Sequence, residues 1–314
     1  MADQAPTFLD VPRLLERSEP RPRPILGWYA LTVLAVFVLT GTLAGSRDPK
    51  LRQTVSPIGA VAMLGVVAAM GAFTSHAVKR QREEQQRLEA VEELVQLRRW
   101  DQAAATLDGM LSRPTRTAGA RVQALVYLCG VLARYHRFAD VLAVQDYLLE
   151  HARFDPAAVH SLKVMRTMAM LHEDHLFDAD RAINELRRES PESAGLALVE
   201  LYRDVKTGHA AEAVDIFRER LPALRDQLGT RVADAYALAA RAHDLLGQDG
   251  EAAVAFERAT LLAPGDELAR RYPEVAPLRE KYPPATVPSQ AQPPQPPQPP
   301  QPPQPPQPPT TGAT

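Results

Sequence analysis

Residues 233–264 read ADAYALAARAHDLLGQDGEAAVAFERATLLAP, and this stretch indicates how most of the chain is built. Its apolar residues recur every three or four positions on either side of a short break that begins at Gly247. This spacing is typical of amphipathic helices, and glycine often ends a helix in the left-handed conformation. The stretch therefore predicts two helices joined by a tight turn.

The same periodicity extends from residue 84 to residue 264, and no segment in this range alternates as a strand does. The breaks between helical segments carry capping signals. Asp155-Pro156 and Ser190-Pro191 each predict an N-cap followed by proline in the first turn, and Gly208 predicts a helix end. We therefore expect an all-α region over residues 76–282.

The stretch 233–264 resembles the tetratricopeptide repeat (TPR), a helix–turn–helix unit of 34 residues. The aromatic, small, bulky and proline positions of that repeat are occupied by Tyr236, Ala240, Ala252, Phe256, Ala259 and Pro264. The match departs at Ala239 and His243, where the repeat has leucine and an aromatic residue. Upstream, the second-helix pattern returns around residues 103, 141, 182 and 213 at uneven spacing. The resemblance implies a TPR-like solenoid over residues 76–282, with a generic helical solenoid as the alternative.

Stacked repeats present an extended concave surface that suits peptides and protein segments. In the TPR family the first helix of each unit lines that surface, so the resemblance implies partner contacts from these helices. Carrying the register over marks as groove residues Gln123, Arg134, Tyr202, Lys206, Asp234, Arg241 and Asp244. A solvated helix face is the alternative interpretation for each of them.

Two apolar stretches near the N-terminus, residues 25–45 and 55–74, contain no charged side chain. Each is close to the ~20 residues that a helix needs to cross a hydrocarbon core of ~30 Å. We expect two transmembrane helices here, preceded by a basic and mostly disordered segment, 1–24. Small residues allow membrane helices to approach closely. Close packing of the two spans is expected at Gly41, Gly45, Gly65 and Ala69.

Positive charge around the two spans predicts their orientation. Eight arginines and lysines flank the outer ends of the hairpin, against three in the loop 46–54. The positive-inside rule then places both termini and the repeat region in the cytoplasm. Arginine outnumbers lysine 31 to 5, which fits a GC-rich bacterial genome and hence a bacterial inner membrane. Because neither span carries an ionisable residue, transport is not indicated.

The C-terminal residues 283–314 contain six consecutive QPP units at 292–309. Proline fixes φ and removes a backbone donor, so we expect a disordered tail with polyproline II character and no core. Two interpretations stay open, a spacer and a ligand for an aromatic-lined groove in a partner.

Catalytic and cofactor-binding motifs are missing from the sequence, which contains no phosphate loop, GxSxG or CxxC. His172-Glu173-Asp174-His175 has two histidines on a helix, but the zinc-protease spacing is one residue longer. The single cysteine, Cys129, lies in an apolar run and is expected to be a buried thiol. The net charge of −2 does not indicate nucleic-acid binding. We predict no enzyme, no cofactor and no nucleic-acid partner.

These features predict a membrane-anchored adaptor or scaffold that binds other proteins through a concave helical-repeat surface. The bilayer anchor would raise the local concentration of whatever is bound. The alternative is a structural subunit of an oligomeric membrane complex, in which copies of the chain assemble through the small-residue hairpin.

Overall fold

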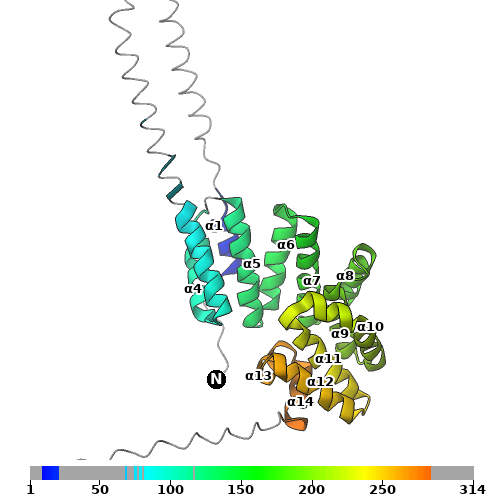
Figure 1. Cartoon of the computed structure of the whole chain (residues 1–314). Helices are drawn as coiled ribbons and strands as arrows, with labels where there is room; N and C mark the ends of the chain where they lie inside the picture. The colour runs from blue at the N-terminus through cyan, green and yellow to red at the C-terminus, as the bar shows by residue number, and fades with distance from the viewer. Residues whose placement is uncertain are drawn as a thin grey trace, which may run out of the picture.

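The computed structural model describes residues 9–20, 68, 74–75, 78–79, 81–115 and 117–283. Every regular element in these residues is a helix, so the described chain is all-α, as the periodicity predicted. The helices form a curved row in which α4 to α7 stand side by side (Figure 1).

Within the described residues, ten helices form five helix–turn–helix units. The pairs are residues 81–96 with α4 (Trp100–Leu111), α5 (Ala118–Arg134) with α6 (Phe138–His151), α7 (Pro156–His172) with α8 (Leu176–Glu189), α9 (Ala194–Thr207) with α10 (Ala210–Leu228), and α11 (Val232–Leu245) with α12 (Asp249–Leu262). A short α1 (Val11–Arg17) precedes them, and the 3₁₀ turn η1 (Gly229–Arg231) leads into α11. After the fifth unit come α13 (Gly265–Arg271), η2 (Pro273–Val275) and α14 (Ala276–Lys281). We refer to residues 265–282 as the C-terminal segment.

One turn geometry joins the two helices of every unit. The turn residue has a positive φ of 57° at Arg98, 57° at His136, 59° at Asp174, 82° at Gly208 and 70° at Gly247. The next residue donates its N–H to the carbonyl five positions earlier, at N···O distances between 2.8 and 3.0 Å. This bond is the longer one of the Schellman motif, which satisfies carbonyls at a helix end. Because the turn recurs five times, the units are structural repeats although their sequences differ.

The turn at Gly247 yields a matched test of this geometry. A Cβ at Gly247 would touch nothing within 4 Å, so the effect of Gly247→Ala comes from its φ of 70° alone. We expect this change to lower the free energy of unfolding by about 1 kcal/mol. Gly250→Ala, three residues later inside α12 and equally open, should raise it by about 0.5 kcal/mol. Thermal unfolding of both variants checks the pair, and equal effects would contradict it.

Small residues bring the helices of the last unit together. Ala240 on α11 and Ala252 and Ala259 on α12 are fully buried at the contact between these helices. Tyr236 and Phe256 fill the space beside them and are 4% and 2% exposed. Burying a phenylalanine side chain contributes about 1.5–3 kcal/mol. The small residues let the two helices approach closely, and the aromatic side chains fill the space that is left beside them. This is the packing that the sequence pattern of residues 233–264 predicted.

Two apolar cores run along the row and meet at α7. The first contains α1, the helix 81–96 and α4 to α6, and α7 contributes Leu162 and Ala169 to it. The second contains α8 to α14, and α7 contributes Met170 and Leu171. Since one helix belongs to both cores, the described residues within 9–20 and 81–282 form one continuous body.

The N-terminal segment differs from its expected disorder, because residues 11–17 form α1 and dock on the array. Leu9, Val11 and Leu14 are buried in the first core. Arg121 of α5 is 7% exposed and donates to the Ser18 hydroxyl at 2.9 Å and to the Leu15 carbonyl. The sequence showed the basic residues of this segment, but the amphipathic spacing of its few apolar residues is what orders it.

The capping signals were right at one break and displaced at another. Asp155 caps α7 by accepting from the Ala158 N–H at 2.7 Å, with Pro156 in the first turn. Ser190-Pro191 does not begin a helix, because α9 starts later, at Ala194, with Ser193 as its N-cap.

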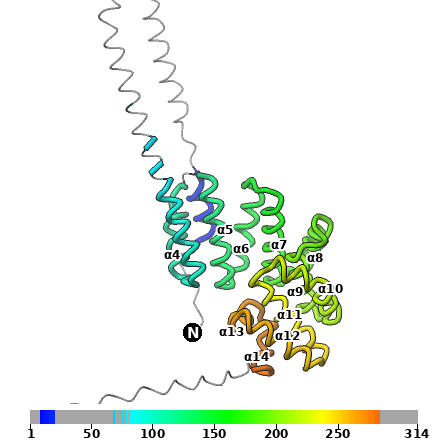
Figure 2. The backbone as a smooth tube through the Cα atoms, in the orientation of Figure 1, coloured from blue at the N-terminus to red at the C-terminus, as the bar shows by residue number. Residues whose placement is uncertain are grey.

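The C-terminal segment turns back toward the first units instead of extending the row. Figure 2 traces the chain from α12 into α13 and α14, which lie on the inner side of the curve near α11. Arg98, in the first interhelical turn, pairs with Glu267 of α13 across 169 residues of sequence. This contact ties the end of the array to its beginning.

Candidate functional site

The predicted groove residues on α9 and α11 face the chain's own C-terminal segment. Asp234 is fully buried, pairs with Arg271 and accepts from the Tyr272 hydroxyl at 3.3 Å. Asp244 accepts from Lys281 at 2.7 Å and also pairs with Arg241. These side chains lie on the inner face of the array, but contacts from residues 271–282 already occupy them.

Three further predicted groove residues also contact other residues of the chain. Tyr202 is fully buried and its hydroxyl lies 3.3 Å from Glu274, while Lys206 pairs with Asp174 at 2.8 Å. Gln123 is half-buried and its side chain hydrogen-bonds Tyr127, which also contacts Glu92 of the helix 81–96. Partner contact by any of these residues stays a prediction.

An aromatic cluster connects the first units to the C-terminal segment. His172 stacks on Phe138 with centroids 4.0 Å apart, and its Nδ1 lies 3.2 Å from the Tyr202 hydroxyl. Tyr202 and Tyr272 then meet edge to face at 5.0 Å. Burial, followed by the positive charges of Lys206 and His136, lowers the pKa of His172 to about 3. The imidazole is therefore neutral and serves as an apolar ring in this cluster.

The lowered pKa of His172 makes the fold sensitive to mild acid. The unfolded chain binds a proton at His172 as pH falls below about 6.5, whereas the folded chain does not until pH approaches 3. Stability from this residue is complete above the unfolded pKa and is lost at about 1.4 kcal/mol per pH unit below it. Between pH 7 and pH 5 we expect the free energy of unfolding of His172→Phe to fall by about 2 kcal/mol less than that of the native chain.

Denaturant titrations at pH 7 and pH 5 check the effect of His172. His175→Phe is the matched control, because His175 is exposed and lies three residues after His172. This substitution should leave the loss of stability between pH 7 and pH 5 unchanged. An identical loss in the native chain and in His172→Phe would rule out this role.

The open part of the inner face is a pocket of about 450 Å³ between α5, α6, α7 and α13, which we name the groove pocket. Its wall is apolar and includes Phe138, Val141, Met165 and Met168. Cys129 also belongs to the wall and is 3% exposed, and burial raises the pKa of its thiol to about 12. Cys129 is therefore a buried, unreactive thiol, as the apolar run predicted.

The rim of the groove pocket is positively charged. Four arginines line it, against one carboxylate, Glu267: they are Arg134, Arg231, Arg270 and Arg271. Arg231 and Arg271 share Asp234 behind the rim. Burial and then the charges of Arg134 and Arg270 lower the pKa of His136 at the same rim. Of the seven groove residues expected from the sequence, Arg134 is the one that lines this pocket.

Gln145 of α6 belongs to the lining of the groove pocket and carries a buried polar atom. Its residue is 1% exposed, it lines the pocket, and its Oε1 accepts no hydrogen bond from the described residues. A buried acceptor without a donor is uncommon and costs about 1–3 kcal/mol. Sequence reasoning missed Gln145 because one polar residue on an amphipathic helix gives no signal of its own.

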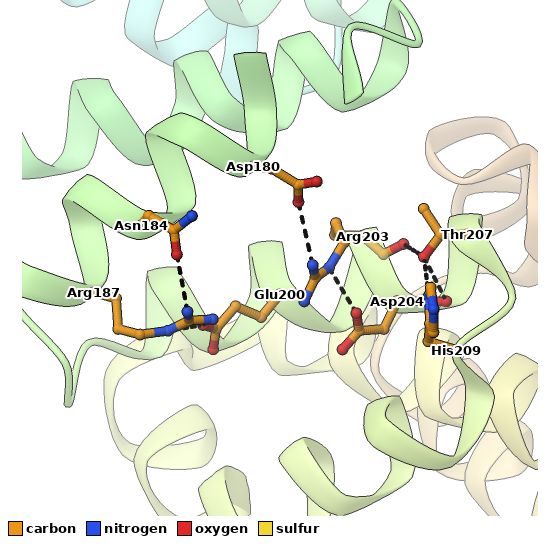
Figure 3. Close-up of polar contacts among 8 residues, drawn as sticks. All are labelled: Asp180, Asn184, Arg187, Glu200, Arg203, Asp204, Thr207 and His209. Carbon is orange, nitrogen blue, oxygen red and sulfur yellow. Dashed lines mark hydrogen bonds and ion pairs between the residues drawn. The ribbon is translucent and has the colours of Figure 1, made fainter. Parts of the chain in front are cut away.

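A second polar cluster joins α8 to α9 away from the groove pocket (Figure 3). Arg187 donates to Glu200 at 2.9 Å, and Arg203 contacts Asp180 at 3.2 Å and Asp204 at 2.6 Å. Burial raises the pKa of the Asp204 carboxyl. Each of these contacts has a structural role between two packed helices, and two of the drawn residues, Asp180 and Asn184, also line a second pocket along α8.

The predicted membrane hairpin lies almost entirely outside the described residues, which include only Ala68 and Thr74 of the spans 25–45 and 55–74. The packing residues Gly41, Gly45, Gly65 and Ala69 are outside them as well, as is the tail beyond residue 283. Of the helices that are described, none combines the length and the apolar character needed to cross a bilayer.

The fold and the pocket define an all-α protein of repeated helix–turn–helix units with an apolar, cation-rimmed pocket on its inner face. Comparison with protein-family models, curated proteins and solved structures found no match for the chain.

Proposed function

We propose that this chain is a membrane-anchored adaptor that binds segments of partner proteins in the groove lined by α5, α6 and α7. The observation that carries the proposal is the groove pocket itself, an open apolar cavity on the inner face of five repeated units. Helical-repeat arrays use that face to bind extended ligands. The recurring turns and the small residues of the last unit also favour the resemblance to the TPR.

The placement of α1 supports the two-span anchor. Residues 9–20 and the helix 81–96 belong to one apolar core, so both ends of the intervening segment start from the same body. A segment that leaves and returns to one body crosses a bilayer an even number of times. Two spans at 25–45 and 55–74 satisfy this condition, and the flanking charge favours both termini in the cytoplasm.

Membrane fractionation tests the anchor. The full chain should stay in the membrane pellet after alkaline carbonate extraction, while Leu34→Arg with Leu64→Arg should move it to the supernatant. An arginine at the centre of a span disfavours insertion by about 2.5–3.5 kcal/mol. Leu51→Arg, in the loop between the spans, is the matched control and should remain in the pellet. A native chain released by carbonate would contradict the anchor.

Protease added to each side of the membrane tests the orientation. Digestion of the C-terminal tail in inverted vesicles, with protection in right-side-out vesicles, is the expected result. The reverse pattern would place the array on the other side and would contradict the cytoplasmic assignment.

A further inference from the structure

Aromatic rings are grouped in the lining of the groove pocket. Trp100, His136, Phe138 and His172 all belong to this lining, and each of them keeps some exposed surface. Phe138 meets His136 edge to face at 5.8 Å and stacks on His172 at 4.0 Å. Proline-rich segments in the polyproline II conformation dock on grooves lined by aromatic side chains. The lining therefore favours a proline-rich ligand.

The charges around the groove pocket already have partners within the chain. Arg231 and Arg271 both pair with Asp234, and Arg134 lies over the Trp100 ring, 5.9 Å from its centroid. A ligand therefore needs no charge of its own. The indole N–H of Trp100 donates to none of the described residues, so a carbonyl acceptor on the ligand suits it.

The C-terminal tail is a proline-rich segment of this kind. Residues 283–314 contain no Asp, Glu, Lys, Arg or His, and residues 292–309 are the six QPP units. A polyproline II helix has three residues per turn and no internal hydrogen bonds. In that conformation the six glutamines fall on one edge, the prolines form a continuous apolar face, and the carbonyls accept bonds from outside the helix. The proline face suits the apolar wall of the groove pocket.

The start of the tail lies within reach of the groove pocket. The Tyr282 hydroxyl contacts Asp244 near the end of α11 at 3.5 Å and Asp249 of α12 at 3.0 Å. Arg231, which lines the pocket, precedes the other end of α11, about 20 Å away at ~1.5 Å per residue. Residues 283–291 extend about 28 Å at ~3.1 Å per residue. This length brings the first QPP unit to the pocket.

We propose that the QPP repeat docks in the groove pocket of its own chain, with its prolines against Trp100 and Phe138 and its glutamines toward solvent. The tail is then a built-in competitor that a partner segment displaces. Because its linker is short, the tail has an effective concentration on the order of 1 mM, so a weak affinity is enough to fill the pocket. The proposal goes beyond the proposed adaptor function, since the occupant belongs to the chain itself.

Trp100 reports occupancy of the groove pocket. Trp28→Phe leaves it as the single tryptophan, and its half-buried ring is within reach of acrylamide. With the full chain in nanodiscs, truncation after Pro283 should raise acrylamide quenching of Trp100 about twofold. The free peptide acetyl-(Gln-Pro-Pro)6-amide at about 5 mM should restore the shielding. A full-length tail in which every Pro-Pro of the repeat is Gly-Ser keeps length and neutrality, and should behave like the truncation.

Two glycines of α5 test where the tail docks. Gly130 lines the groove pocket and Gly119 does not, and a Cβ at either position would meet nothing within 4 Å. Gly130→Leu takes up space in the pocket, so truncation should no longer change the quenching of Trp100. Gly119→Leu should keep the twofold effect. Loss of the effect in both variants, or in neither, would contradict docking in this pocket.

Photo-crosslinking identifies the occupant. A diazirine amino acid at position 165 lies in the pocket wall, and trypsin releases the tail as one peptide, 282–314, because no Lys or Arg follows Lys281. The expected adduct joins this peptide to the α7 peptide that carries position 165. Isotopically labelled and unlabelled chains mixed in one membrane should give no adduct between the two forms. A mixed adduct would mean that a second copy supplies the tail and would overturn docking within one chain.

Failure of this proposal is distinguishable from failure of the adaptor function. Unchanged quenching after truncation, or full shielding by the Gly-Ser tail, overturns the docking of the tail while membrane anchoring and partner binding stand. An adduct with another protein and none with the tail has the same consequence. In native membranes truncation should raise the yield of a partner adduct from position 165, and an unchanged yield overturns the competitor role. A chain released by carbonate overturns the adaptor function, whatever the tail does.

Discussion

Asp234→Ala should lower the free energy of unfolding by about 3 kcal/mol and release the C-terminal segment. Asp234 is fully buried on α11 and holds Arg271, Arg231 and the Tyr272 hydroxyl. Removing one partner of a buried ion pair commonly costs 3–5 kcal/mol, because the remaining charge is left without compensation. The side chains of Arg231 and Arg271 stay 50% and 36% exposed, so solvent relieves part of that penalty. We therefore expect the lower end of the range.

Denaturant unfolding and limited proteolysis together measure this effect. Cleavage within residues 265–282 should accelerate in Asp234→Ala, since Tyr272 loses its acceptor and Arg271 loses its ion pair to α11. Asp226→Ala on the exposed face of α10 is the control and should change stability by less than about 0.5 kcal/mol. Unchanged proteolysis of the segment in Asp234→Ala would show that other contacts hold it.

Arg121→Ala should lower the free energy of unfolding by about 2–3 kcal/mol and detach α1. The guanidinium bonds Ser18, the Leu15 carbonyl and the Tyr147 hydroxyl, the last at 2.6 Å. It also lies over the Tyr147 ring, 4.8 Å from the centroid. Alanine removes these hydrogen bonds and the packing of a side chain that is 7% exposed, and it leaves the Leu15 carbonyl without that donor.

Trypsin digestion follows the detachment of α1 directly. Arg13 and Arg17 lie on its exposed side, and a docked helix should protect the bonds beside them. Arg121→Ala should make these bonds labile, whereas Arg113→Ala, an exposed arginine before α5, should not. Equal cleavage in the two variants would mean that α1 is held by its apolar residues alone.

The last unit was the most predictable part of the fold, because the spacing of its small and aromatic residues indicates how its two helices pack. Ala240, Ala252 and Ala259 recur where two helices must approach closely, and all three are fully buried. Glycines marked two of the five interhelical turns, Gly208 and Gly247. The other three turns place Arg98, His136 and Asp174 in the same left-handed conformation. No sequence signal marked them, because packing of the flanking helices imposes a conformation that these residues disfavour.

The groove was predicted less well, because its contacts join residues that are far apart in the sequence. Register placed Tyr202, Asp234 and Asp244 on the inner face, but their contacts come from residues 271–282, about 40 to 70 positions later. The periodicity of a helix shows that it has an apolar face and does not show what covers it. The groove pocket depends on the return of α13 to the first units, so Gln145 and Arg270 gave no signal in the sequence.

Site-specific photo-crosslinking in native membranes tests the central claim that the groove pocket holds a segment of a partner. A diazirine amino acid at position 168 lies in the pocket wall, and one at position 177 lies on the outer face of α8, where Phe177 is 84% exposed. The account predicts a discrete adduct from position 168 in the membrane fraction and no such adduct from position 177. The adduct from position 168 should be lost in Gly130→Leu, because Gly130 lines the groove pocket and the larger side chain would take up space in it. An adduct of equal strength from both positions, or one that survives Gly130→Leu, would contradict it.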